Sequence, residues 1–332
     1  MDKVDFAIPD EYRQMQLLVR KYVQTELIPL ENIVYERGEI SRDLWSELVA
    51  KSKALGLYAP FAPEEYGGAG LNSCLAYMLM SEEMGRTIDA FKYLVGLGYE
   101  TGADVATKEQ LGRYYSRIWQ GTSRFFVAVT EPDAGTDVLG MKSTAVRRGD
   151  GWVINGSKLF ISHFGEADWG IIFALTDKAK RRVSAFLIET NTPGLTGRRL
   201  QTMGVRGQNL YEVFMDECFV PQSSLLGEEG KGLRLFMGYL DLIRMRVGVR
   251  GLGVAQRCLE MTLDYVKQRK IFGKPLATFQ ALQFMLVDLW MEIETTRSLL
   301  LRAYAEMDNN GRIYIPDSCA CKVLGSEVGG GM

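Results

Sequence analysis

The run from Thr130 to Asp137, which reads TEPDAGTD, holds the residue types of this chain that best suit ligand binding. It follows an apolar, strand-like segment at Phe125–Val129. Proline fixes one φ angle in the run, and glycine permits backbone geometries and close approaches that other residues resist. The run therefore predicts a shaped loop leaving a strand, with hydroxyls and backbone N–H groups free to face a polar ligand. An ordinary turn is the alternative interpretation of the same residues.

Two further stretches combine ring, hydroxyl and charged side chains. Asn155-Gly156 predicts a tight hairpin turn, and Phe160 and Ser162 follow it at a spacing of two residues. Arg269–Leu276 places Arg and Lys at the end of a long helical pattern, before Gly and Pro. The helix dipole alone explains that placement, whereas an Arg fork also suits a phosphate pair.

Composition bounds the class of protein. The chain has 332 residues, which is enough for two or three domains with buried cores. Hydrophobic residues make up 47% and charged residues 24%, as in ordinary soluble proteins. The net charge of −2 favours neither nucleic acid nor a membrane as a partner. We find no apolar run of transmembrane length and no secretory signal core.

Cysteine and histidine usage narrows the chemistry. The five cysteines are scattered and odd in number, which predicts free thiols in a reduced, cytoplasmic setting. His163 is the single histidine, so a His-rich metal site is excluded. No Gly-x-Ser-x-Gly elbow and no Walker A motif is present.

The hydrophobic pattern changes twice along the chain. Residues 1–121 are mostly helical, with a Ser-capped helix after Ser41 and another over 73–86. Residues 122–230 contain short β-branched and aromatic runs separated by turn formers, which predict an antiparallel β-barrel. Residues 231–332 are helical again, over 233–269, 279–307 and 319–328. We therefore predict an α+β multidomain chain: a helical domain, a β-barrel domain and an incomplete helical bundle.

These stretches, in this order, resemble the acyl-CoA dehydrogenase family of flavoproteins. The resemblance also covers Met203–Arg206 with Val213–Pro221, which we interpret as a turn and closing strand, and Tyr239–Arg244 on the first long C-terminal helix. It implies FAD as the cofactor, with Arg269 binding the pyrophosphate of FAD in a neighbouring subunit. The residues implied to contact FAD are Val127, Val129, Thr130, Thr136, Phe160, Ser162, Arg269, Phe272 and Gln280. Those implied to contact the substrate are Thr136, Asp241 and Arg244.

The family relationship implies removal of hydrogens at Cα and Cβ of an acyl-CoA thioester, as in fatty acid metabolism. Hydride would pass to flavin N5, and electrons to an electron-transfer flavoprotein. One alternative is the reverse reaction, reduction of an enoyl-CoA, as in reductases of the crotonobetainyl-CoA type. Another is a non-catalytic member that binds flavin or a partner. The resemblance also implies a homo-oligomer, either a dimer or a tetramer.

The sequence departs from the family pattern at the catalytic base. The usual Glu would lie beyond Met332, and Ile243 stands at the alternative base position, so no base is identified. Because the chain ends on what looks like the middle of a family helix, we expect it to be truncated. Charged residues at Asp89, Lys92 and Glu100 stand where the acyl-pocket segment of the family is apolar. We interpret them as a solvated face, with a polar acyl group or an unusual base as the alternative.

Overall fold

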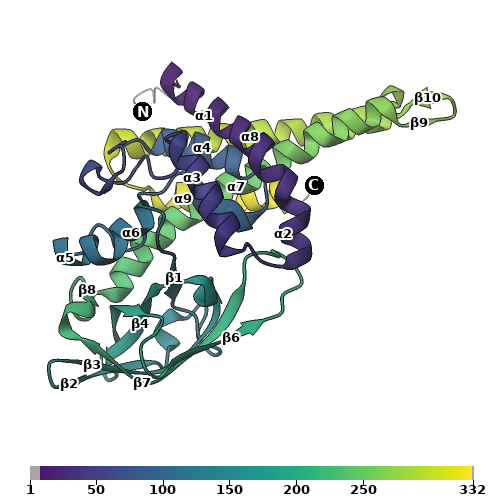
Figure 1. Cartoon of the computed structure of the whole chain (residues 1–332). Coiled ribbons are helices and arrows are strands. Elements are labelled where there is room, and N and C mark those ends of the chain that lie inside the picture. Colours follow the sequence, from purple (N-terminus) through teal and green to yellow (C-terminus); the bar gives the residue numbers. More distant parts are fainter. Residues whose placement is uncertain (1–7, 331–332) are drawn as a thin grey trace.

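A computed structural model describes residues 8–330 and arranges them as a helical part, a β-sheet part and a second helical part (Figure 1). The predicted α+β organisation is confirmed. The N-terminal part is built from short helices joined by turns, among them a 3₁₀ segment at Asp89–Leu94. Its α-helices are α1 (Asp10–Tyr22), α2 (Glu31–Arg37), α3 (Arg42–Ala54), α4 (Cys74–Met84), α5 (Lys108–Gln110) and α6 (Ser116–Trp119).

Serine caps begin two of these helices, and the sequence predicts the one at Ser41. Ser41 Oγ accepts a hydrogen bond from Leu44 N at 3.3 Å at the start of α3. Ser73 Oγ accepts one from Ala76 N at 3.1 Å at the start of α4. Each cap satisfies a backbone donor that the first turn of a helix leaves unpaired. Helix α4 is buried between the N-terminal and C-terminal helices, and its Glu82 and Glu83 pair there with Arg297 and Arg20.

The middle part is one curled sheet whose hydrogen-bonded order is β6-β7-β3-β2-β4-β5-β8, with β1 paired to β4. Most pairings are antiparallel, as predicted. The structure refines the predicted barrel in two respects: β1 and β2 pair with β4 in parallel, and the hydrogen-bonded path ends at β6 and β8. The strands are β1 (Phe125–Ala128), β2 (Thr144–Arg148), β3 (Gly151–Ser162), β4 (Trp169–Asp177), β5 (Arg182–Glu189), β6 (Leu195–Leu200), β7 (Leu210–Pro221) and β8 (Leu225–Leu226).

The predicted hairpin turn at Asn155-Gly156 is wrong. Both residues lie inside β3, at an irregularity in its pairing with β7, and the chain turns instead at Gly149-Asp150. Gly156 has a φ of +142°, and a Cβ there would clash with Ser143. Asn155 donates to Glu217 Oε1 at 2.8 Å and accepts from Glu217 N at 2.8 Å across the bulge. The pair therefore shapes a β-bulge rather than a turn.

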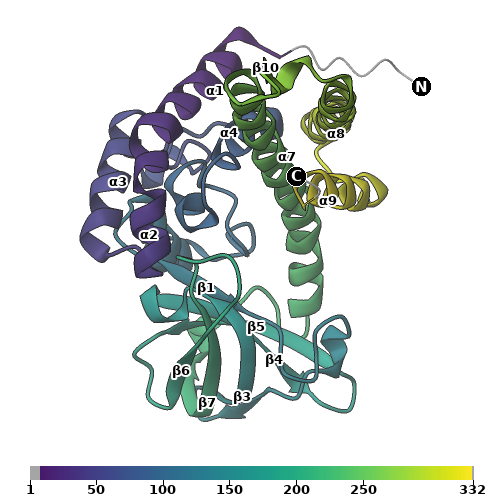
Figure 2. The same cartoon turned by 90° about the vertical axis from the view of Figure 1, so that its right-hand side faces the viewer.

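The C-terminal part confirms the three predicted helices. They are α7 (Gly232–Gln268), α8 (Gln280–Asn310) and α9 (Ile315–Gly330), with a small hairpin of β9 (Lys270–Ile271) and β10 (Lys274–Pro275) between the first two. Figure 1 shows α7 and α8 projecting from the body with β9 and β10 at the tip. Figure 2 shows α7 running from the sheet to the opposite end of the molecule.

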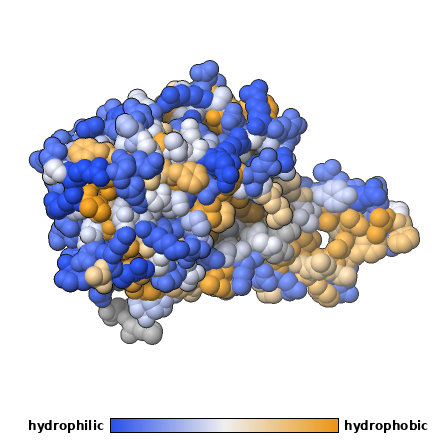
Figure 3. All heavy atoms as spheres, turned by 90° about the horizontal axis from the view of Figure 1, so that it is seen from below, coloured by the Kyte–Doolittle hydropathy of each residue, from blue (hydrophilic) through white to orange (hydrophobic). Residues whose placement is uncertain are grey.

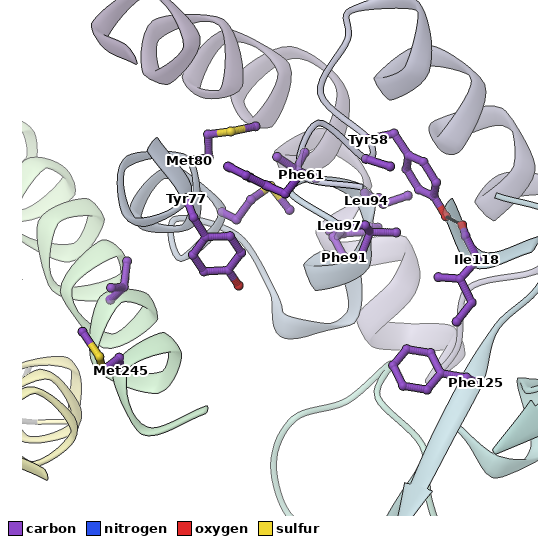
Figure 4. Close-up of a cluster of buried hydrophobic side chains, with 14 of the residues drawn as sticks. Tyr58, Phe61, Tyr77, Met80, Phe91, Leu94, Leu97, Ile118, Phe125 and Met245 are labelled. Carbon is purple, nitrogen blue, oxygen red and sulfur yellow. Dashed lines mark hydrogen bonds between the residues drawn. The ribbon is translucent and has the colours of Figure 1, made fainter. Parts of the chain in front are cut away.

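Buried side chains form two clusters. The larger joins the helical parts to one side of the sheet, and the smaller fills the inside of the curled sheet around Trp152, Phe126 and Phe186. Figure 4 shows part of the larger cluster, where Phe61, Tyr77 and Phe91 lie between the N-terminal helices and α7. In the part of the chain that the structure describes, no helix is long and apolar enough to cross a membrane.

Candidate functional site

A cavity of about 290 Å³ lies where the sheet faces α7. The end of β1 and the residues after it form one side, and the end of β3 forms the next. Helix α7 closes the cavity opposite them. Its lining residues are Tyr93, Phe125, Phe126, Val127, Val129, Thr130, Phe160, Ile161, Ser162, His163, Phe236, Tyr239, Leu240 and Ile243.

Five of the residues predicted to contact FAD meet at this cavity, although the two strands are about thirty residues apart in sequence. They are Val127, Val129, Thr130, Phe160 and Ser162. Ile243, at the alternative base position, lines the α7 side. None of the lining residues is Asp or Glu. The cavity thus offers an apolar wall and the hydroxyls of two tyrosines, a threonine and a serine, and no carboxylate that could accept a proton lines it.

A bulge at the end of β3 presents Phe160 to the cavity. The pairing of β3 with β7 is irregular between Lys158 and Ile161, and Phe160 has a φ of +59°. A non-glycine residue in this left-handed region is uncommon and often marks a functional site. Phe160 is 59% exposed and lines the cavity. The bulge therefore turns an aromatic ring towards the cavity instead of the core.

The hydroxyl of Ser162 is oriented by a neighbour on the loop before β7. Gln208 Nε2 donates to Ser162 Oγ at 2.9 Å. A hydroxyl that accepts at its oxygen keeps its own hydrogen free to donate. Ser162 can therefore donate a hydrogen bond to a ligand in the cavity.

A buried ion pair fixes the loop that carries Thr130. Lys158 Nζ, whose side chain has no exposed surface, donates to Val129 O at 3.0 Å and to Glu131 Oε1 at 2.8 Å. The Glu131 carboxylate also accepts backbone hydrogen bonds from Lys142 at 2.6 Å and Ser143 at 3.1 Å. Burial works to raise the pKa of Glu131, but Lys158 and these donors hold it below the ordinary value.

Several predicted residues lie outside the cavity. Thr136 is exposed on the loop after β1. Asp241 and Arg244 lie on α7 beside the lining residues Leu240 and Ile243 and form an ion pair with each other. The other three predicted FAD contacts are exposed at the tip of the α7–α8 hairpin: Arg269, Phe272 and Gln280. The structure thus places five of the predicted site residues at the cavity, three at the tip of the hairpin and three at neither place.

The charged segment Asp89–Glu100 is not the solvated face that we expected. Glu100 is buried, and its Oε2 accepts from Trp119 Nε1 at 2.5 Å. Burial raises the pKa of this carboxyl. Lys92 Nζ donates to Asp89 Oδ2 at 3.0 Å, and Arg250 on α7 donates to Asp89 Oδ1 at 2.6 Å. The ion pair of Asp89 with Arg250 connects the N-terminal part to α7, so these charged side chains lie inside the molecule.

A smaller cavity of about 30 Å³ lies next to the first one, and Tyr93, Phe125 and His163 line both. Burial lowers the pKa of His163 to about 3, with the nearby Lys92 acting in the same direction. His163 is therefore neutral at physiological pH. Its ring packs edge-on against Tyr93 with centroids 5.5 Å apart.

The residues of the larger cavity fit an isoalloxazine ring. Val127, Val129 and Phe160 supply an apolar surface, and Thr130 and Ser162 supply hydroxyls at its edge. The predicted FAD is therefore compatible with this site. Lys158, Gln208 and Tyr239 also belong to the site or support it, and sequence reasoning assigned them no role. Lys158 carries the one usable signal, a lysine within an otherwise buried strand pattern.

Comparison with protein families gives matches along almost the whole chain. Residues 9–122 match the family model described as acyl-CoA dehydrogenase, N-terminal domain. Residues 127–218 match the middle domain, and residues 230–329 match the C-terminal domain.

Curated proteins share the full span of these matches. The chain is 33% identical to the probable acyl-CoA dehydrogenase YngJ of Bacillus subtilis, over 98% of this chain and 86% of that protein. It is 34% identical to a glutaryl-CoA dehydrogenase of Desulfococcus multivorans, over 93% and 82%. It is 32% identical to an NADH-dependent acryloyl-CoA reductase of Anaerotignum propionicum, over 98% and 84%.

Solved structures share the fold. A chain from work on the electron transferring flavoprotein of Acidaminococcus fermentans has a TM-score of 0.88 and 32% identity, covering 98% of this chain and 86% of that one. A glutaryl-CoA dehydrogenase of Mycobacterium smegmatis in complex with FADH2 has a TM-score of 0.88 and 25% identity, covering 97% and 82%.

Proposed function

The chain belongs to the acyl-CoA dehydrogenase family of FAD-dependent oxidoreductases that act on CH–CH groups, and from this premise we propose that it oxidises an acyl-CoA thioester between Cα and Cβ. The observation that carries the proposal is the cavity between the sheet and α7. Its sheet side suits the flavin, and its α7 side leaves room for the thioester. Bound FAD would supply the hydride acceptor for this oxidation.

Each side of the cavity has a separate role. Ser162, oriented by Gln208, would donate a hydrogen bond to the flavin, and Thr130 would lie beside the same ring. Phe160 would shield the ring from water. On the other side, Tyr239 and Ile243 hold the acyl group against the flavin. We assign no catalytic base, because no carboxylate lines the cavity in residues 8–330.

The predicted residues at the tip of the α7–α8 hairpin support binding of FAD by a neighbouring subunit. Arg269 follows Ile243 by 26 residues of α7 and its cap, which at 1.5 Å per residue is about 39 Å along the helix. No single dinucleotide spans that distance. We therefore propose that Arg269, Phe272 and Gln280 reach the FAD of a neighbouring subunit, with Arg269 at the pyrophosphate. Asp241 and Arg244 stay our proposed contacts for the substrate, and Thr136 is proposed to contact both FAD and the substrate.

The surface of the hairpin supports a homo-oligomer. Figure 3 shows hydrophobic residues gathered on the projecting arm. Exposed apolar area of this extent marks an interaction surface in proteins of known structure. A second copy of the chain would cover it and would bring the tip to another cavity. Its large exposed side chains include Met261, Tyr265, Phe272, Phe284, Met285 and Trp290.

The relatives support a proposed electron partner and a proposed direction of the reaction. The proposed acceptor is an electron-transfer flavoprotein, and the neighbour from the Acidaminococcus fermentans work supports it. The acryloyl-CoA reductase relative favours a second candidate, reduction of an enoyl-CoA at the same site. The cysteines are all unpaired, which supports the predicted cytoplasmic setting.

The test is an anaerobic titration of the purified, FAD-loaded protein with saturated and unsaturated acyl-CoA thioesters. Bleaching of the oxidised flavin by a saturated thioester is the expected result. A reductase would be identified if no saturated thioester bleached the oxidised flavin and an enoyl-CoA reoxidised the chemically reduced flavin. A protein that takes up no flavin, or whose flavin responds to no thioester, would contradict both candidates.

A further inference from the structure

Arg246 on α7 is partly buried, and no carboxylate of residues 8–330 pairs with it. Its Nη2 donates to Tyr99 O at 2.9 Å, and its guanidinium lies over the Tyr77 ring at 4.8 Å. The buried Nε has no hydrogen-bond partner. Protein interiors rarely leave a guanidinium uncompensated, because desolvating a charge without a partner is costly.

The neighbouring arginines of α7 make the contrast clear. Arg244 pairs with Asp241, Arg250 with Asp89 and Arg257 with Glu31. Each of these pairs compensates its charge within the protein. Arg246 lies among them on the same helix without such a partner, so its charge is available to a ligand.

Unpaired hydroxyls surround the same place. Thr101 and Tyr304 have no exposed surface, and neither Thr101 Oγ1 nor Tyr304 OH has a hydrogen-bond partner. Tyr99 OH is also buried and unpaired. These residues come from the loop after the 3₁₀ segment and from α8. Buried polar groups are normally hydrogen-bonded, so several unpaired donors beside one cation indicate a site for an acceptor.

Through Tyr99, this cluster adjoins a large cavity that is next to the flavin-facing one. The second cavity has a volume of about 860 Å³ and is lined by Gly98, Tyr99, Glu100, Tyr239 and Leu242, among others. Tyr239 lines both cavities. Arg246 follows Leu242 by one helical turn, so it lies on the same face of α7. Figure 4 shows Tyr77 on the side of the buried cluster that faces α7.

The nearest carboxylate, Glu100, favours the charged form of Arg246 and so raises its pKa, but it makes no direct contact with the guanidinium. The Glu100 carboxylate is occupied by Trp119 Nε1 and by Gly98 N at 3.1 Å, and it makes no ion pair with Arg246. Asp89 is shared between Lys92 and Arg250. Three cations, Lys92, Arg246 and Arg250, therefore lie near only two carboxyl groups, those of Asp89 and Glu100.

We propose that Arg246, with the hydroxyls of Tyr99 and Tyr304, binds a carboxylate at the far end of the acyl group. The substrate class is therefore the CoA thioester of a short dicarboxylic acid rather than of a plain fatty acid. A planar carboxylate matches the guanidinium fork and accepts hydrogen bonds from tyrosyl hydroxyls. This inference rests on the proposed function, because it places the reacting carbons at the flavin-facing cavity.

Calorimetric titration with matched thioesters tests the subsite. The pairs have equal carbon number: succinyl-CoA against butyryl-CoA, glutaryl-CoA against pentanoyl-CoA, and adipoyl-CoA against hexanoyl-CoA. In the FAD-loaded wild-type protein, we expect one dicarboxylic thioester to bind at least about 10-fold more tightly than its partner. Arg246→Met should abolish that preference while the methyl-ended thioester binds as before. Arg302→Met, at an ion pair on α8, is the matched control and should keep the preference.

A more conservative variant tests the subsite without the risk that the protein fails to fold. Tyr304→Phe removes one unpaired hydroxyl and keeps the ring, so it should fold and should reduce the preference a few-fold. Equal affinity for both members of every pair in the wild type would overturn the subsite and leave the proposed function intact. Absence of binding or flavin bleaching with all six thioesters would instead contradict the proposed function.

Discussion

Lys158 is a lysine with no exposed surface, and the wall facing the flavin depends on it. Its ammonium holds the carbonyl of Val129 and the carboxylate of Glu131, which flank Thr130 on both sides. Leu159 N donates to Thr130 O at 2.8 Å, which ties the loop directly to β3. Thr130 and the Phe160 bulge are therefore positioned relative to each other by one buried set of contacts.

Replacing Lys158 by Met should destabilise the protein strongly. The variant leaves the Glu131 carboxylate buried without its counter-charge, which costs about 3–5 kcal/mol when one partner of a buried pair is removed. Thermal unfolding followed by circular dichroism measures this loss. Lys142→Met is the control, since its ion pair with Asp133 is exposed and should contribute nothing measurable. Equal midpoints for the two variants would show that the buried pair does not anchor the loop.

His163 gives a pH prediction with a definite sign. The folded protein keeps the imidazole neutral because burial lowers its pKa to about 3, whereas the unfolded chain binds a proton near the ordinary value of 6.5. The unfolded state then binds more protons at acidic pH, so the free energy of unfolding falls by up to about 1.4 kcal/mol per pH unit below 6.5. This loss continues towards the folded pKa of about 3.

Because His163 is the only histidine, its titration can be observed directly. In protein labelled with ¹³C at histidine, the imidazole resonance should stay constant between about pH 5 and 8. His163→Gln should also flatten the decline in thermal midpoint over the same range. A resonance that titrates near pH 6.5 would show that the imidazole is open to water.

At the scale of elements, α7 and α9 approach closely along glycines. A Cβ on Gly325 would clash with the backbone of Gly248, and a Cβ on Gly251 would clash with the backbone of Gly325. Gly325→Ala should therefore force the helices apart and cost about 1–3 kcal/mol. Gly330→Ala is the control on the same helix, because nothing lies within 4 Å of its added Cβ. The thermal unfolding midpoints of the two variants test this prediction. A midpoint for Gly325→Ala as high as that for Gly330→Ala would contradict the close approach of α7 and α9.

The sequence predicted the elements better than their irregularities. Helix caps at Ser41 and Ser73 are local, since each depends on one side chain and the next turn of backbone. The bulge at Asn155-Gly156 depends on Ser143 and Glu217, which lie on other segments. A pair with strong turn propensity therefore became part of a long strand, because tertiary contacts decided its conformation.

The same distinction applies to the site. Ring and hydroxyl residues at Phe160 and Ser162 could be identified from their types and spacing. Their orientation could not, because it depends on Gln208 and on the pairing of β3 with β7. Likewise, the burial of Glu100 follows from Trp119, a partner that no pattern near Glu100 indicates.

At the scale of the whole molecule, the projecting hairpin links assembly to cofactor binding. If the tip reaches the FAD of a neighbouring subunit, one association equilibrium governs both properties. FAD should then dissociate as the protein is diluted below the concentration at which the oligomer forms. Sedimentation velocity read at both protein and flavin wavelengths measures the two together.

Arg269→Ala separates the roles of the tip. Arg269 is exposed, and none of its side-chain atoms is held by the rest of the chain in residues 8–330, so its removal should leave the fold intact. Loss of a charge-assisted contact to a pyrophosphate costs about 1.5–3 kcal/mol, so FAD should bind at least about 10-fold more weakly. Lys274→Ala, on β10 of the same tip, is the control for a general loss of positive charge. Unchanged FAD affinity in Arg269→Ala, with the oligomer preserved, would remove Arg269 from the cofactor site. Weaker FAD binding in an intact oligomer would place the pyrophosphate at the tip of the neighbouring subunit, because Arg269 cannot reach the cavity of its own chain.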